Sequence, residues 1–374
     1  MPTPDEVLEA INGSVAAIAA KAAVVDAEGR FPDDNLRILS DAGAFGLVAS
    51  PDYGGAGGTL GHLVKACEAI GGACASTGMV FLMHSVTVAT LQGGDGPAAE
   101  AAVRDIVDTR ALATLAFSER ATGAHFYAPE LKAVKNDDGF VSVSGRKSFV
   151  TSGGQADYYL ILVQTDGGAD TYLMTKSDEG LSWEGTWMGL GMAGNSSIAM
   201  NLDNVRLGPD RLVGAPGKAG DLIFGVVAPW FLLGLSAVNV GIAQAAATAA
   251  SEHVKARRYG SGGILAEVQY IQHLVADMDL ATRKARLLVH NAAALGDSGD
   301  PGALVPIMEA KVGSTEAAQD VTSLAMTATG GQGYTPSLPV ERHLRDARAG
   351  AVMAPTNAIL RNWIGKALTG LPVP

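Results

Sequence analysis

Histidines are the side chains of this chain best suited to move protons near neutral pH, and two of them have distinctive surroundings. His84 lies in the apolar run VFLMHSV, and His125 ends the segment LAFSERATGAH, which also contains Glu119. The ordinary pKa of imidazole is close to neutrality, so either histidine could act as a general acid or base. A lone histidine on an apolar face is more often a hydrogen-bonded core residue, so both interpretations stay open.

A second group of residues is suited to binding phosphate. The run Gly330-Gly331-Gln332-Gly333 can bring backbone amides close to an anion because glycine carries no side chain. The same glycines could simply end a helix, since glycine accepts the left-handed conformation that follows a helix. Arg257 and Arg258 lie in the segment KARRYG, where a guanidinium could either bind phosphate oxygens or stay exposed.

Several other chemistries are disfavoured. The chain has no HExxH motif, no P-loop and no nucleophile elbow. Its two cysteines, Cys67 and Cys74, lie one heptad apart in a helical pattern without a set of metal ligands, which predicts packed thiols and no metal site. The 27 Lys and Arg against 38 Asp and Glu leave a net charge of −11 without a basic cluster. A nucleic-acid partner and a polybasic membrane patch are therefore not expected.

The predicted secondary-structure pattern changes twice along the 374 residues of the sequence, of which 48% are apolar. Residues 5–110 have helical patterns with glycine-rich joints. Residues 112–212 contain short strand patterns such as DYYLILVQ and TYLMTK, and helical patterns return after the loop GAPGKAG. We therefore predict a helical domain at 1–111, a β domain at 112–213 and a helical bundle at 214–374.

One uncharged segment, Leu222 to Ser251, is long enough to cross a bilayer. It contains Pro229 and Asn239 and lacks a flanking basic asymmetry, which favours a buried bundle helix beginning after Pro229. The stretch from Leu233 to Ala250 is apolar on more than one face, which also predicts at least a dimer. The N-terminal MPTPDEVLEAING has no apolar signal core, so the expected location is the cytoplasm.

Several segments resemble the motifs of one protein family. They occur in the order of that family and cover nearly the whole chain. They are FPDDNLRILSDAGAFGLVASPDYGG, LAFSERATGAH, GRKSFVTSGGQADYYLI, GLGMAGNSSIAMNLDNVRL, RRYG with the stretch from Gln269 to Met278, GGQGY and RDARAGAVMAPTNAILR. Together they resemble the acyl-CoA dehydrogenase family of flavoproteins.

The resemblance implies an α+β multidomain fold with an N-terminal helical domain, a central β-barrel-like domain and a C-terminal four-helix bundle. It also implies an acyl thioester substrate, on CoA or a carrier protein, and an electron-transfer partner. In this family a homo-dimer or homo-tetramer completes each FAD site with residues of a neighbouring subunit. By position, Phe149 would cover the outer face of the flavin, and the hydroxyl of Thr151 would approach N5. The positions carried over to FAD binding are Leu115, Phe117, Ser118, Gly123, Ala124, Phe149, Thr151, Arg258, Gln269, Gly330, Gly331 and Thr356.

The chain departs from the family pattern where the chemistry is most demanding. In the motif RDA(K/R)xxxIYEGTxxIxR, the Glu that removes the substrate α-proton corresponds to Ala354, and the following Gly corresponds to Pro355. Some relatives place this Glu at the start of the long bundle helix, but the residues here are Pro229-Trp230-Phe231. The Arg of the R-x-x-F-G element, which binds the FAD pyrophosphate, corresponds to Ala256.

Three hypotheses are therefore compatible with the sequence. The first is a divergent dehydrogenase whose base comes from an unusual position, with His84 and His125 as weak candidates. The second is a monooxygenase on the same frame, supplied with reduced flavin by a flavin reductase, which needs no base for the α-proton. The third is a non-catalytic partner subunit, which the loss of carboxylate and arginine at 354 and 256 would suit.

Overall fold

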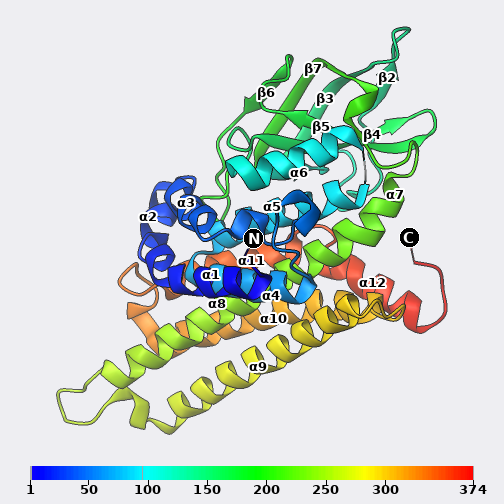
Figure 1. Ribbon diagram of the computed structural model, residues 1–374. Helices are drawn as coiled ribbons and strands as arrows, with labels where there is room; N and C mark the ends of the chain where they lie inside the picture. The colour runs from blue at the N-terminus through cyan, green and yellow to red at the C-terminus, as the bar shows by residue number, and fades with distance from the viewer. Residues whose placement is uncertain (1, 95, 374) are drawn as a thin grey trace.

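The computed structural model describes residues 2–94 and 96–373, and its elements follow the order helices, strands, helices (Figure 1). The N-terminal helices are α1 (Pro4–Ala19), α2 (Ala22–Glu28), α3 (Asp33–Asp41), α4 (Leu60–Ala73), α5 (Ala75–Gly94) and α6 (Pro97–Thr109). The strands are β1 (Ala113–Ala116), β2 (Ala133–Lys135), β3 (Val141–Val150), β4 (Tyr158–Thr165), β5 (Gly168–Thr175), β6 (Leu181–Glu184), β7 (Ile198–Leu207) and β8 (Leu212–Val213). The C-terminal helices are α7 (Ala219–Leu222), α8 (Ala228–Ala256), α9 (Gln269–Asp297), α10 (Leu304–Thr329), α11 (Val340–Val352) and α12 (Asn357–Leu368).

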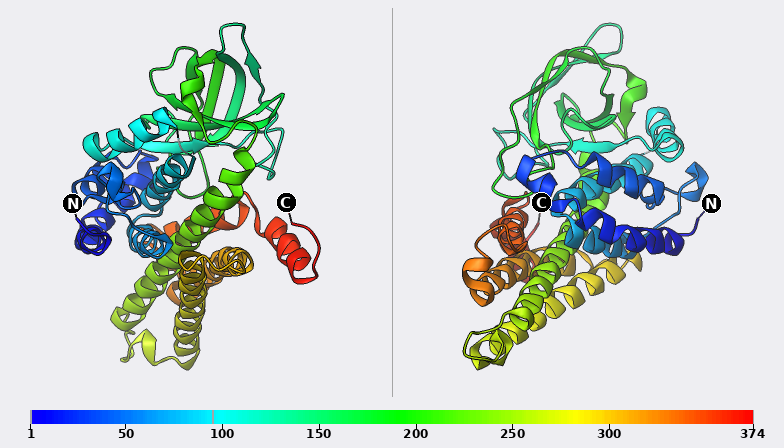
Figure 2. Two further views of the ribbon diagram at one scale, coloured as in Figure 1. Left: turned by 45° about the vertical axis from the view of Figure 1, so that its right-hand side comes forward. Right: turned by 90° about the vertical axis from the view of Figure 1, so that its left-hand side faces the viewer.

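The strands form two four-stranded sheets, in the orders β1-β4-β5-β8 and β2-β3-β7-β6. The pair β1 and β4 is parallel, whereas the other strand pairs are antiparallel. Apolar side chains of both sheets face one another, and β4 is buried over most of its length because it lies in the middle of its sheet. Figure 2 shows these sheets stacked at one end of the molecule, above the helices.

Helix α5 joins the three parts of the fold, since it contacts β1 on one side and α8 on another. Its apolar residues lie all around the helix, and nearly all of them are buried. A helix that is apolar on every face is stable in water only when other elements surround it. The position of α5 therefore explains its composition.

Helices α4 and α8 cross at glycines. A Cβ at Gly241 of α8 would lie 2.2 Å from the carbonyl oxygen of Glu68 on α4, and a Cβ at Gly71 would lie 2.8 Å from the Cα of Val238. Without side chains at these points the two backbones approach more closely than larger residues would allow. This crossing fixes α8 at the centre of the bundle, between α4, α9 and α10.

The apolar segment from Ala219 to Ala256 has the length and composition to cross a membrane, but 72% of its most apolar window is buried inside the protein. It forms the core helix α8 of the bundle, preceded by α7 and a π-helical turn, in agreement with the sequence-based expectation of a bundle helix. Cys67 and Cys74 are both free and buried, and burial raises the pKa of each thiol. They are packed core residues.

Candidate active site

An irregularity in β3 turns one aromatic residue out of the β domain. The pairing of β3 with β7 shifts register between Lys147 and Val150, as in a β-bulge, and Phe149 within this interval has a φ of 53°. Bulges often re-aim a side chain, and here Lys147 and Val150 remain buried while Phe149 is 69% exposed. The ring of Phe149 meets that of Trp187 edge to face, with centroids 6.4 Å apart. The bulge therefore presents an exposed aromatic surface.

Next to this surface lies a pair of buried hydroxyl groups. The Oγ1 of Thr151 and the Oγ of Ser197 are 3.0 Å apart, and the hydroxyl of Thr114 on β1 donates to the carbonyl of Thr151 at 2.9 Å. The end of β3, the start of β7 and the strand β1 thus meet at Thr151.

The two loops that carry these residues hold strained backbone. Ser152, Met192 and Ser196 have φ values of 61°, 50° and 47°, in the left-handed region that side chains disfavour. Two polar atoms here, the Oγ of Ser152 and the Oδ1 of Asn195, are buried without a hydrogen-bond partner among the residues that the structure describes. Unpaired buried polar atoms are costly, and their position beside Thr151 fits a site for a polar ligand edge.

The end of β1 lies beside the same part of β3. The amide of Ser148 donates to the carbonyl of Ser118 at 2.8 Å, while Leu115 and Phe117 are buried. The structure therefore brings Ser118 close to the segment that carries Phe149 and Thr151, although Ser118 is distant from them in sequence. Gly123 and Ala124 lie farther along the same chain segment, in an irregular turn between β1 and β2.

Glu119 follows Ser118, and its carboxylate forms an ion pair and hydrogen bonds within the β domain. Its carboxylate contacts the Nζ of Lys147 at 2.6 Å and accepts the amide protons of Glu130 and Leu131, each at 3.1 Å. The pKa of Lys147 is lowered to about 8, chiefly by burial, against the opposing effect of Glu119. This pair ties the β1–β2 connection to β3 and leaves neither group available for proton transfer.

His84 occupies a core position, which corrects its candidacy as a base. It is fully buried, its Nε2 lies 3.0 Å from the carbonyl of Phe45, and its Nδ1 accepts the amide proton of Ala113 at 3.2 Å. Burial lowers its pKa to about 4. Because both ring nitrogens are engaged by backbone, His84 stabilises the contact of α5 with β1. His125 is exposed in the turn after β1, where its Nδ1 is 2.9 Å from the hydroxyl of Tyr127.

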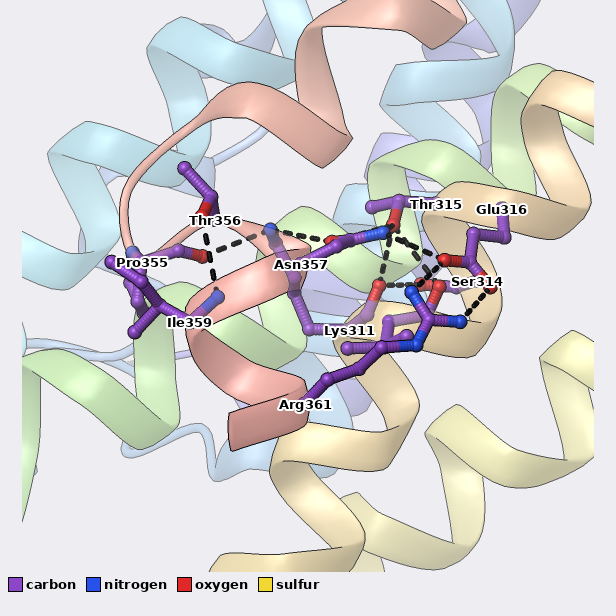
Figure 3. A network of polar contacts seen from close by, with 10 residues as sticks. Lys311, Ser314, Thr315, Glu316, Pro355, Thr356, Asn357, Ile359 and Arg361 are labelled. Carbon is purple, nitrogen blue, oxygen red and sulfur yellow. Dashed lines mark hydrogen bonds and ion pairs between the residues drawn. The ribbon is translucent and has the colours of Figure 1, made fainter. Parts of the chain in front are cut away.

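The loop between α11 and α12 contains Ala354, which the sequence motif aligns with the family's base, followed by Pro355 and Thr356. Thr356 caps α12, because its hydroxyl accepts the amide proton of Ile359 at 3.4 Å. Figure 3 shows that the loop rests on Lys311 of α10. The Nζ of Lys311 donates to the carbonyls of Met353 and Pro355 and to the side chain of Asn357.

The described carboxylates nearest to this loop are held by other groups. Glu316 pairs with Arg361, which lowers the pKa of the Glu316 carboxyl. Asp346, nearly two turns before the end of α11, accepts the amide proton of Met192 at 2.6 Å, and burial raises its pKa to about 6. Both carboxylates are therefore engaged by neighbouring groups.

The remaining predicted cofactor residues lie in other places. Arg258 and Gln269 are exposed at the tip of the α8–α9 hairpin, at the end of the molecule opposite the strands (Figures 1 and 2). Gly330 ends α10 with a φ of 56°, as expected of a helix stop, and Gly331 follows in an exposed turn. These residues are not brought to Thr151 within one chain. The larger of the two described cavities, about 760 Å³, lies among α1, α4, α8 and α9, and Thr151 and Ala354 line neither cavity.

Sequence reasoning missed Trp187, Asn195, Ser197 and Lys311. Ser197 and Asn195 lie in the recognised segment GLGMAGNSSIAMNL, but only the pairing of β3 with β7 indicates which of its side chains meet Thr151. Lys311 is a buried lysine in an apolar helical pattern, a signal that could have been noticed.

The comparisons with known proteins agree over all parts of the chain. The family models described as acyl-CoA dehydrogenase N-terminal, middle and C-terminal domains match residues 5–96, 114–205 and 233–369. A cyclohexane-1-carbonyl-CoA dehydrogenase of Geobacter metallireducens is 32% identical over 358 residues, covering 93% of this chain and 92% of the relative. A short-chain-specific acyl-CoA dehydrogenase of Clostridium acetobutylicum is 29% identical over 345 residues, covering 90% of each chain. The solved butyryl-CoA dehydrogenase of Megasphaera elsdenii superimposes with a TM-score of 0.92 at 25% identity, over 98% of both chains.

Proposed function

This chain belongs to the acyl-CoA dehydrogenase family, and from that premise we propose that it is an FAD-dependent oxidoreductase that dehydrogenates an acyl thioester between Cα and Cβ. The observation that supports this best is the position of Ser118 close to the segment that carries Phe149 and Thr151. The relatives named above do not favour the monooxygenase alternative. Electrons are expected to pass to an electron-transfer partner protein.

The residues of the β domain fit the polar edge and one face of a flavin. The hydroxyls of Thr151 and Ser118 would hold its edge, and the unpaired Oγ of Ser152 and Oδ1 of Asn195 are further polar atoms at the same place. Phe149 and Trp187 would cover its outer face. When bound, FAD supplies the hydride acceptor for the β-carbon.

The loop at 353–356 would act on the thioester carbonyl. The amide of Ala354 donates no hydrogen bond to any residue in the parts of the chain that the structure describes, 2–94 and 96–373. A free N–H that meets the carbonyl oxygen would stabilise the negative charge that develops there as the α-proton leaves. Ala354 itself cannot accept that proton, so this step is expected to be slow unless another group serves as base.

Purified protein should carry FAD, and anaerobic mixing with a panel of saturated acyl-CoAs tests the proposal. At least one thioester should bleach the flavin absorbance slowly and yield its 2-enoyl product. Ala354→Glu should speed bleaching roughly 10²-fold or more, the usual contribution of a positioned base, if Pro355 leaves the carboxylate aimed at the α-carbon.

Two results would contradict the proposal. FAD-loaded protein that no thioester in the panel bleaches would favour the non-catalytic subunit. Substrate-dependent O2 uptake, with an external reductase supplying reduced flavin, would favour the monooxygenase.

A further inference from the structure

Lys311 is buried beneath the active-site loop and makes contacts of an unusual kind. Its side chain is fully inaccessible, and its Nζ donates to the carbonyl of Met353 at 3.3 Å, the carbonyl of Pro355 at 3.0 Å and the Oδ1 of Asn357 at 2.9 Å. All three acceptors lie in the loop that joins α11 to α12 or on Asn357, the first residue of α12 (Figure 3).

The number of acceptors matches an ammonium group. A protonated lysine has three N–H donors, and each has one acceptor here. Among the residues that the structure describes, no carboxylate pairs directly with this charge, because Glu316 is paired with Arg361 and Lys311 faces neutral oxygens. A buried charge without a paired counter-ion costs stability, and an apolar side chain of similar size would generally cost less. We therefore attribute the role of Lys311 to the orientation of the three groups that it binds.

The planarity of the peptide bond transmits this orientation to Ala354. The carbonyl of Met353 and the N–H of Ala354 belong to one trans peptide unit, in which the two bonds point in opposite directions. Because Nζ draws the Met353 carbonyl toward α10, the Ala354 N–H points away from α10. The second hydrogen bond, to the Pro355 carbonyl, holds the peptide unit between Pro355 and Thr356.

We propose that Lys311 is the positioning residue that aims the Ala354 amide at the thioester carbonyl of the substrate. This inference rests on the function proposed above and adds to it a residue outside the recognised motifs. In a chain that lacks the carboxylate at position 354, polarisation of the carbonyl is the contribution that the loop can still make to removal of the α-proton.

The inference has a consequence for pH dependence. Burial lowers the pKa of Lys311 to about 7, and the negative charge of Glu316 opposes this shift. The other ionised group nearby is Arg361, which is bound to Glu316, while Asn357 and Thr315 are neutral. Loss of a proton leaves two N–H donors for three acceptors, so the loop should loosen as pH rises through about 7.

A chromophoric enoyl thioester, an aryl-acryloyl-CoA, tests this directly because its absorption moves to longer wavelength when its carbonyl is polarised. Bound to the FAD-loaded wild type, it should show this red shift at pH 6 and a smaller one at pH 8.5. Lys311→Met should abolish most of the red shift at both pH values and lower the bleaching rate by an acyl-CoA roughly tenfold to a hundredfold, with little change in KM. Thr322→Val, which removes a buried hydroxyl from the same helix, should match the wild type.

The outcomes separate the two proposals. If the wild type binds the probe without a red shift, the proposed carbonyl site fails. If the wild type shows the shift and FAD-loaded Lys311→Met shows it equally, Lys311 has no positioning role and the proposed function stands. Should Lys311→Met fail to fold, the wild-type red shift decides alone, because a shift constant between pH 6 and 8.5 would overturn the inference.

Discussion

Lys147 and Lys311 are both fully buried, and the groups that each contacts indicate different roles. Lys147 contacts the carboxylate of Glu119, whereas Lys311 contacts backbone and amide oxygens of the active-site loop. Burial lowers both pKa values, to about 8 for Lys147 and about 7 for Lys311. The first lysine closes an internal ion pair, and the second holds a loop in one geometry.

At this scale, Thr151→Val tests the candidate flavin edge. Valine keeps the shape of threonine but removes the hydroxyl that lies 3.0 Å from the Ser197 hydroxyl. Under the proposed function this hydroxyl also bonds the flavin edge, and loss of that bond costs about 1 kcal/mol, so the dissociation constant of FAD should rise roughly fivefold. Equilibrium dialysis against FAD measures it. Thr282→Val, a buried threonine on α9, should retain FAD as the wild type does, and equal retention by both variants would count against the assignment.

The burial of His84 predicts that the folded state loses stability as the pH falls. Its folded-state pKa of about 4 lies below the unfolded value of 6.5, so the unfolded chain binds a proton that the folded chain does not. Stability contributed by neutral His84 is therefore lost as pH falls from 6.5 toward 4. Denaturant unfolding at several pH values should show a shallower decline for His84→Gln, while exposed His125→Gln should follow the wild type. A parallel decline in all three proteins would show that His84 does not titrate as described.

At the scale of elements, short departures from regular helix and strand geometry shape the candidate site and the helix bundle. The bulge in β3 exposes Phe149 between buried Lys147 and buried Val150, and glycines let α4 and α8 cross at backbone contact. Regular helices and strands alone would give neither the aromatic surface nor the central position of α8.

The helix crossing predicts that Gly241→Ala is destabilising. A methyl group there would lie 2.2 Å from the carbonyl oxygen of Glu68, and neither backbone can move without disturbing the bundle core. We expect a loss of about 1–3 kcal/mol or more in the free energy of unfolding. Gly13→Ala in α1, where nothing lies within 4 Å, should instead stabilise by up to about 1 kcal/mol. Urea titration measures both, and equal effects would show that the crossing is not tight.

On the scale of the whole molecule, the predicted cofactor residues divide into two groups. One gathers at Thr151 in the β domain, and the other, with Arg258, lies at the far tip of the α8–α9 hairpin (Figure 1). The all-round apolar surface of α8, which led us to expect an oligomer, is largely buried within its own chain. Helix α9, by contrast, carries two exposed leucines, Leu280 and Leu287, which are 51% and 71% exposed.

The separation of the two groups predicts that the FAD-loaded protein is at least a dimer, since a second copy must supply the residues for the adenosine half. Sedimentation velocity should show the assembly, and Leu287→Glu should weaken it by replacing an exposed leucine of α9 with a charge. A stable FAD-loaded monomer would contradict this prediction.

The sequence by itself determined the family, the α+β fold class and the FAD cofactor, because these depend on local patterns that recur in order along the chain. It also aligned Ala354 with the position of the family's usual base, and that assignment stays a prediction. It could not determine the partners of His84 or Lys311, because a buried polar side chain has the same local pattern whether it holds a backbone or serves a substrate. Tertiary structure decided these roles: the packing of α5 against β1 engages both nitrogens of His84, and the turn from α11 to α12 brings three oxygens to one buried amine.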